Sequence, residues 1–161
     1  MQEIVLTQGK VTQVSDHWFE YLNQWKWCAQ KDKNGVWYAV RHGKSVNRKQ
    51  PGIKMHRVIM NAPDGVLVDH KDNDGLNNQD DNLRFCTNTQ NQHNSKLRQD
   101  NKFGYKGIFP DKDTRKWEAY IGINGKKKYL GCSCDPKEAA RIYDKAAIKY
   151  FGDFAALNFP L

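Results

Sequence analysis

Long apolar runs are missing from this 161-residue sequence, and none approaches the ~20 residues that a membrane-spanning helix needs. Residues 1–10 also lack the apolar core of a secretory signal. The four cysteines form no C-x-x-C pair, so a zinc knuckle is not predicted. These absences predict a cytoplasmic protein with reduced thiols and no membrane partner. The cysteines are Cys28, Cys86, Cys132 and Cys134.

Positive charge is what the sequence has in excess. Basic residues outnumber acidic ones by 26 to 18, which gives a net charge of +8 and a pI near 9.3. Residues 1–95 carry 12 basic and 10 acidic side chains (net +2), whereas residues 96–161 carry 14 and 8 (net +6). This balance favours a polyanionic partner, nucleic acid before membrane. We expect the last third of the chain to supply most of the electrostatic attraction.

Residues 66–94 combine a histidine with side chains that bind hard cations. An apolar run ends in Asp69-His70, a turn-rich segment follows, and a second short strand is predicted over 82–86. A polar segment from 87 to about 97 has a cap-like start, which indicates a helix. Histidine accepts a proton near neutral pH, and carboxylate and amide oxygens are ligands that Mg²⁺ accepts. This combination suits phosphodiester cleavage.

The same stretch resembles the ββα-metal motif of HNH endonucleases, most closely the phage and intron-associated homing branch. In that branch an Asn follows the Asp by 13 residues and another follows 9 later, which matches Asn82 and Asn91 here. The resemblance implies Asp69 and Asn91 as ligands of one divalent metal ion, Mg²⁺ or Mn²⁺. It implies His70 as general base, with Asn82 bracing the loop and orienting His70. His93 is an alternative ligand within one helical turn of Asn91.

The simpler alternative is an Asx-rich surface loop, since Asn and Asp are common in turns. Residues 2–50 are predicted to form short strands and turns, and a helix is predicted over 54–60. The HNH resemblance extends loosely over this region to residue 3. Within the helix, Arg57 is a candidate phosphate ligand because its guanidinium offers a bidentate fork. A polar segment from about 95 to 103 is expected to run along DNA. It carries three further cations: Lys96, Arg98 and Lys102.

A second module is predicted after residue 103. Strands are expected over 105–109, 116–123 and 126–130, with Asn124-Gly125 as the hairpin turn. A helix is expected to begin after Asp135, because an N-cap, a proline at the first helical position and a glutamate follow in the preferred order. Its apolar face is rich in alanine, and small side chains would let the helix lie close to the sheet.

This module resembles the AP2/ERF DNA-binding domain, through GYKGI, KWEAYI, KKKYLG, EAARIYDKAAIKYFG and the closing ALNFP. Domains of that family lay their sheet into the major groove of double-stranded DNA. The first hairpin here is lysine-biased, and lysine is a poorer base reader than arginine. The alternative is a lysine run that forms a solvated face. The residues that the resemblance implies for DNA contact are Lys106, Arg115, Lys116, Trp117, Glu118, Lys126, Lys128 and Tyr129.

The sequence therefore predicts an α+β protein with two modules. Residues 1–97 would form an HNH endonuclease domain with its ββα-metal core at about 54–97, residues 98–103 a linker, and residues 104–161 a three-stranded antiparallel sheet packed on one helix. The predicted function is a site-directed, metal-dependent DNA endonuclease of the phage or mobile-element homing type. As a monomer it would nick, and as a homodimer it could cut both strands. The expected location is bacterial cytoplasm or a phage-infected host cell. The alternative is a DNA-binding regulator with an inactive HNH module.

Overall fold

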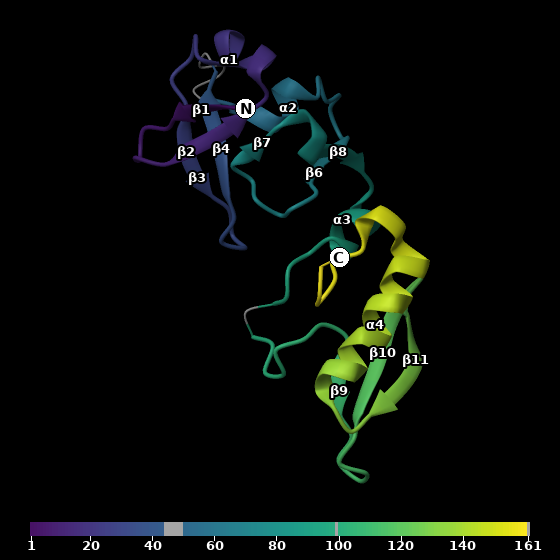
Figure 1. Cartoon of the computed structure of the whole chain (residues 1–161). Helices are drawn as coiled ribbons and strands as arrows, with labels where there is room; N and C mark the ends of the chain where they lie inside the picture. The colour runs from purple at the N-terminus through teal and green to yellow at the C-terminus, as the bar shows by residue number, and fades with distance from the viewer. Residues whose placement is uncertain (44–49, 99, 161) are drawn as a thin grey trace. The chain divides into compact units, whose positions relative to one another are not determined.

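The computed structural model describes residues 1–43, 50–98 and 100–160 and has α+β architecture with several small sheets. The chain divides into two compact units, residues 1–88 and 89–161 (Figure 1). The division falls earlier than the functional boundary predicted at residue 97, which stays a prediction. Over the part of the chain that the structure describes, no helix has the length and apolar character to cross a membrane.

The first unit begins with a hairpin that is later joined by a distant strand. β1 (Gln2–Val5) pairs antiparallel with β2 (Val11–Val14), and β2 pairs in parallel with β7 (Asn77–Asn78). Helix α1 (Asp16–Leu22) follows β2. The two-residue strand β7 was not predicted, because its pairing depends on contacts more than sixty residues apart in sequence.

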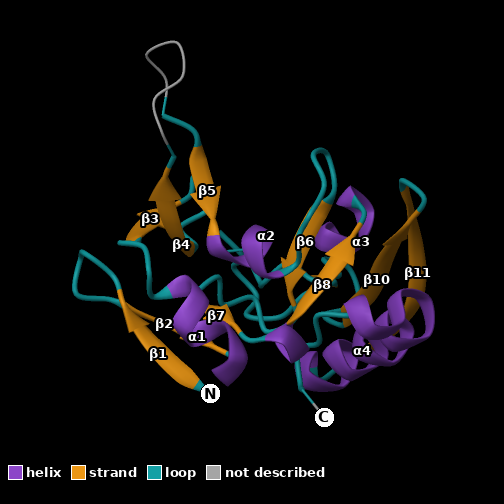
Figure 2. Ribbon diagram, turned by 90° about the horizontal axis from the view of Figure 1, so that it is seen from above, coloured by secondary structure: helices purple, strands orange, loops and turns teal. Residues whose placement is uncertain are grey.

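A second sheet of the first unit contains β3 (Cys28–Lys31), β4 (Trp37–His42) and β5 (Gly52–Lys54), and α2 (Met55–Ile59) follows directly (Figure 2). The hairpin of β3 and β4 and the helix α2 were expected from the sequence, whereas β5 was not.

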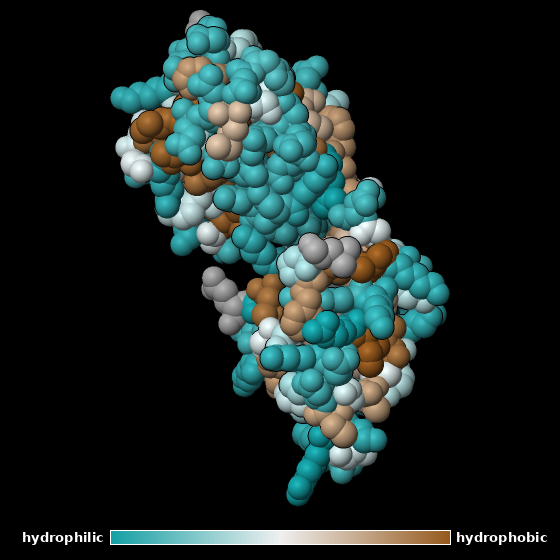
Figure 3. Space-filling view, in the orientation of Figure 1, coloured by the Kyte–Doolittle hydropathy of each residue, from teal (hydrophilic) through white to brown (hydrophobic). Residues whose placement is uncertain are grey.

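The core of the first unit is shared between these elements. Trp27, Leu22 and Met55 are each 1 % exposed or less and pack in one cluster with residues of β1, β2 and β8. Burying such a side chain contributes roughly 1.5–3 kcal/mol. On the face shown in Figure 3, hydrophobic residues form separate small groups among hydrophilic ones on each unit.

The predicted strand–loop–strand pattern is present. β6 (Leu67–His70) pairs antiparallel with β8 (Leu83–Cys86), after a 3₁₀ turn at Asp80–Asn82. The helix that follows, α3 (Asn88–His93), is shorter than the predicted 87–97. The segment after it is polar and lacks an apolar face that would stabilise a longer helix by packing.

The second unit contains the three-stranded antiparallel sheet and the long helix that the sequence predicts. β9 (Ile108–Pro110), β10 (Trp117–Ile123) and β11 (Lys126–Ser133) lie in the order β11-β10-β9, and α4 (Pro136–Phe151) packs across the sheet (Figure 1). The start of α4 is capped by Asp135, whose side chain accepts a hydrogen bond from the Lys137 backbone.

Small residues allow this close packing. Ala139, Ala140 and Ala147 of α4 are fully buried beside Ile108 and Ile121 of the sheet. α4 ends at Phe151, the residue before Gly152.

Candidate active site and nucleic-acid interface

Asp69 and His70 end β6 and are both buried, each 5 % exposed. Buried polar side chains are costly unless they find hydrogen-bond partners. The partners of these two residues therefore decide what the site can do.

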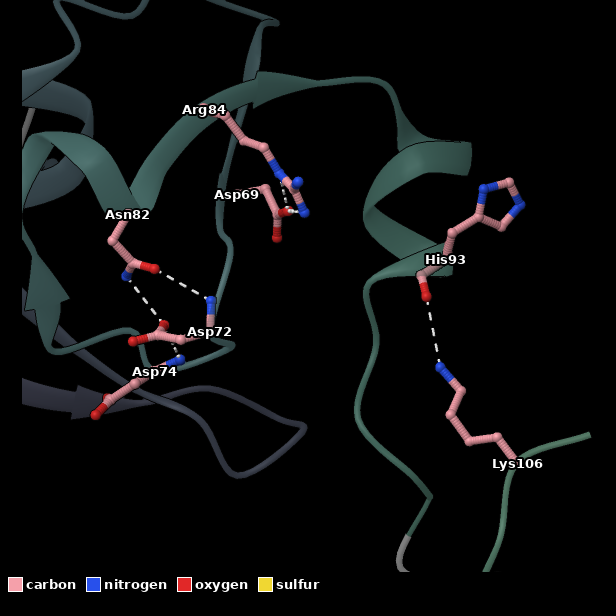
Figure 4. Close-up of polar contacts among 7 residues, drawn as sticks. All are labelled: Asp69, Asp72, Asp74, Asn82, Arg84, His93 and Lys106. Atoms are coloured by element: carbon pink, nitrogen blue, oxygen red, sulfur yellow. Dashed lines mark hydrogen bonds and ion pairs between the residues drawn. The ribbon is translucent and has the colours of Figure 1, made fainter. Parts of the chain in front are cut away.

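Asp69 is paired with Arg84 across the sheet. The β6–β8 register places the two residues opposite each other, and Arg84 donates from Nε and Nη2 to Oδ2 of Asp69 at 2.9 and 2.7 Å (Figure 4). Their side chains are 6 % and 12 % exposed. Sequence analysis missed Arg84, although aligning the two predicted strands antiparallel would have placed it beside Asp69.

His70 is held by a chain of hydrogen bonds to the N-terminal hairpin. Its Nε2 lies 3.2 Å from Oδ1 of Asn78, whose Nδ2 donates to Oγ1 of Thr12 at 2.7 Å. The Thr12 hydroxyl in turn donates to the carbonyl of Leu76 at 2.7 Å. The Thr12 oxygen is thus an acceptor for Asn78, which leaves the amide oxygen facing the imidazole. His70 therefore carries its proton on Nε2, and Nδ1 is its basic nitrogen.

Burial keeps His70 neutral. Desolvation lowers its pKa from the ordinary 6.5, and the neighbouring carboxylates and Asn78 only partly oppose this effect. His56 and Tyr38 surround the ring, with centroids 4.9 and 5.9 Å from that of His70. Burial lowers the pKa of His56 to about 3. Both imidazoles are therefore neutral at pH 7, the state that a general base requires.

Asn82 braces the loop between the two strands. Its Oδ1 accepts from the Asp72 backbone at 3.1 Å, and its Nδ2 donates to Oδ1 of Asp72 at 2.9 Å and to the Asn77 carbonyl at 2.8 Å (Figure 4). The loop also passes close to β4, because a Cβ on Gly75 would overlap the Trp37 carbonyl. These bonds hold the loop, and the role in the site predicted for Asn82 stays a prediction. A side-chain hydrogen bond that orients His70 comes from Asn78, which sequence analysis missed.

The predicted metal ligands come from both units, so their joint geometry stays a prediction. Asp69 belongs to the first unit, and Asn91 and His93 to the second. Asn91 is exposed, and the ring of His93 stacks on Phe151 at 3.6 Å between centroids. Within the described ranges, no three His, Cys, Asp or Glu side chains gather in a metal-binding group. The carboxylate of Asp69 and an amide oxygen still form a donor set that suits Mg²⁺ or Mn²⁺.

Arg57 is hydrogen-bonded to backbone carbonyls. Its guanidinium donates to the carbonyls of Val66 at 2.6 Å, Pro63 at 2.8 Å and Ala62 at 3.3 Å. These bonds hold the turn that leads into β6. Phosphate contact by Arg57 stays a prediction, and the structure supplies a second reason for an arginine at this position.

The cations of the segment after α3 differ in their surroundings. Lys106 is partly buried, which lowers its pKa, and its Nζ donates to the carbonyls of Ser95 at 2.6 Å and His93 at 3.4 Å (Figure 4). Arg98 pairs with Asp100 at 3.1 Å on the surface. Lys96 and Lys102 are exposed, as are Arg115 and Lys116. Lys106 thus fastens the loop, whereas the other cations lie at the surface.

The sheet register sorts the remaining predicted DNA contacts into two faces. Trp117 packs in the core cluster beside Ala119, Lys126 lies opposite Ile123, and Lys128 donates to the Tyr150 hydroxyl of α4, so all three are on the helix side. Glu118 and Tyr129 lie on the open face. The open face also carries three side chains that sequence analysis did not name: Phe109, Tyr120 and Lys127.

No family model matches the chain. It is 32 % identical over 161 residues to an uncharacterized HNH endonuclease of Acanthamoeba polyphaga mimivirus, which covers 96 % of this chain and 79 % of that protein. The chain therefore belongs to the HNH endonuclease family.

Plant proteins share a shorter region. The chain is 44 % identical over 57 residues to APETALA2-like protein 2 of Oryza sativa, and 36 % identical over 67 residues to an AP2-like ethylene-responsive transcription factor of Arabidopsis thaliana. Each match covers 35 % of this chain, but only 13 % and 16 % of those proteins. The chain thus spans less than a fifth of these plant relatives.

Proposed function

We propose that the chain is a metal-dependent DNA endonuclease that hydrolyses phosphodiester bonds. The observation that carries the proposal is a neutral, buried His70 whose tautomer is set by Asn78, next to the buried carboxylate of Asp69. The first unit would form the ββα-metal module. The second would form an AP2-like module that anchors the chain on double-stranded DNA.

In the proposed reaction, His70 takes a proton from the attacking water at Nδ1. Asn78 holds the opposite nitrogen, so the ring keeps its orientation as the imidazolium forms. Asp69 and Asn91 would hold one Mg²⁺ or Mn²⁺ ion, which supplies charge stabilisation on the phosphate. In-line attack would leave a 5′ phosphate and a 3′ hydroxyl, the products expected for the family.

One such site cuts one strand, so a monomer would nick and a homodimer could cut both. We further propose a site-directed, homing-type role for a gene carried by a phage or another mobile element. The protein would then act in the cytoplasm of a bacterium or of an infected host cell.

The test is cleavage of supercoiled plasmid with Mg²⁺ and with Mn²⁺. We expect metal-dependent conversion to open circle, loss of the product with EDTA, and loss with His70→Ala. The matched control is His42→Ala, which alters an exposed histidine of β4. Linear product that appears at the same time as open circle would indicate two active sites that cut the two strands together. Cleavage that survives His70→Ala would contradict the assignment of the base.

A second candidate function is a DNA-binding regulator. It is favoured by one observation, namely that Arg84 already occupies an oxygen of the predicted metal ligand Asp69. DNA binding without cleavage in either metal would support this function. If wild type does not cleave and Arg84→Gln does cleave in the same metal, the arginine blocks the metal site.

The anchoring role of the second unit is tested through salt dependence. Each phosphate contact contributes about 0.9 to the slope of log K against log salt for duplex DNA. Replacing both Arg115 and Lys116 by Gln should lower this slope by about 1 to 2. Substitution is preferable to deletion of residues 100–161, because Phe151 supports His93 of α3. An unchanged slope would show that these two cations make no phosphate contact.

A further inference from the structure

The open face of the β9–β11 sheet carries a row of aromatic rings. Phe109, Tyr120 and Tyr129 come from three neighbouring strands, with ring centroids 6.0 and 5.4 Å apart. Phe109 and Tyr129 are 42 % and 50 % exposed. Three rings in a row on a solvent-facing sheet form a surface on which flat groups can stack.

A cation lies within this row. Nζ of Lys127 is 4.1 Å from the ring centroid of Phe109 and 3.8 Å from that of Tyr120. Lys127 is thereby held over the rings instead of extending away from the sheet. A ligand that stacks on the rings and carries negative charge would meet both features at once.

A pocket of about 610 Å³ adjoins the row at Phe109 and Tyr120, where residues 95–98 and 100–103 lie near β10. Its lining adds Phe103, Lys102 and Gly122 to these rings and to Lys127. The volume is typical of a small-molecule site and too small for a double helix. Five cations and one acid line the pocket, so an anionic occupant is favoured: Lys96, Arg98, Lys102, Lys106, Lys127 and Asp100.

Readout of paired bases would need other side chains on this face. Base edges in the major groove are read mainly by Arg, Lys, Asn and Gln through hydrogen bonds. The open face presents three rings together with Glu118 and Lys127, and Lys127 lies over two of the rings. Gly122 leaves open space beside them. Aromatic side chains bind nucleic acids by stacking on bases that have left the helix, a mode that tolerates any base.

We propose that this face binds an unpaired nucleotide of DNA, with its base on the aromatic row or in the adjoining pocket and its phosphates at the lysines. The choice of DNA rests on the proposed function. The site would direct the chain to gaps, bubbles or displaced strands, in addition to the duplex contacts made elsewhere on the basic unit.

The test measures binding of the full-length chain by fluorescence anisotropy, in EDTA so that no strand is cut. The probes are a labelled single-stranded DNA, its duplex, the duplex with a three-nucleotide bubble, and the RNA of the same sequence. We expect single-stranded and bubble DNA to bind about tenfold or more tightly than duplex, because stacking is lost only in the duplex.

Two variants and one control locate the site. Tyr129→Ala removes an exposed ring and should weaken single-strand binding about tenfold. Gly122→Leu should fill the pocket without a backbone clash, since no atom lies within 4 Å of its added Cβ. Tyr150→Ala is the matched control, because it removes a 40 % exposed tyrosine from α4. Thermal unfolding verifies that each variant is folded.

The inference is overturned if duplex binds as tightly as single strand, or if Tyr129→Ala and Tyr150→Ala have equal effects. RNA binding tenfold tighter than DNA would also overturn it. Single-strand preference in a chain that fails to cut plasmid would support the inference while rejecting the proposed endonuclease, so the two failures are distinguishable.

Discussion

His56 should make the first unit sensitive to acid. It lies in α2, is 5 % exposed, and packs between the rings of Tyr38 and His70 at centroid distances of 5.5 and 4.9 Å. Its Nδ1 is buried and has no hydrogen-bond partner among the residues that the structure describes. Charging this ring would place an unpaired cation in the interior. His56→Phe keeps an aromatic ring there and removes the titration.

The size of the effect follows from the pKa difference between the folded and unfolded chain. The folded pKa of His56 is about 3, and the ordinary value is 6.5. Because the unfolded chain takes up the proton first, the stabilising contribution is complete above pH 6.5 and is lost as the pH falls toward 3. Each pH unit in this window corresponds to 1.36 kcal/mol. Between pH 7 and pH 5, His56 should therefore remove about 2 kcal/mol of unfolding free energy.

The assay is urea unfolding at pH 7 and pH 5, followed by tryptophan fluorescence. From pH 7 to pH 5, the unfolding free energy of wild type should fall by about 2 kcal/mol more than that of His56→Phe. This difference does not depend on the absolute stability of the variant. His42→Phe, which alters an exposed histidine, should behave as wild type. Equal pH dependence in wild type and His56→Phe would refute the reasoning, because it would mean that His56 takes up its proton as readily in the folded chain as in the unfolded chain.

Four further substitutions test the structure, one of them as a control. Asn82→Ala removes three hydrogen bonds from the loop and should lower the unfolding free energy by about 2 kcal/mol and reduce plasmid cleavage; unchanged urea unfolding would contradict the bracing role. Asp135→Ala removes the N-cap of α4 and should cost about 1 kcal/mol in the same assay. Gly107→Ala should destabilise by more than about 2 kcal/mol, because the added Cβ would overlap the Tyr143 ring. Gly104→Ala, with nothing within 4 Å, should cost less, and equal losses would argue against the close packing.

Much of the second unit was predictable because its signals are local. The Asn124-Gly125 turn, the Asp135 cap with Pro136, and the stop at Gly152 each depend on a few consecutive residues, and all three are present. Which side chains face the open side was not predictable in the same way. The β10–β11 pairing contains an irregularity between Ala119 and Tyr120, and a local change of register decides which residues share a face.

The sequence by itself determined the α+β class, the likeness to HNH endonucleases and the segment in which Asp69 and His70 lie. Only the tertiary structure decided their partners. Arg84 lies beside Asp69 because β8 pairs with β6. Asn78 lies beside His70 because its strand, β7, pairs with β2 near the start of the chain. Residue types record which chemistry is available. Partner choice, tautomer and pKa depend on burial and on contacts between distant segments, which arise only when the chain has folded.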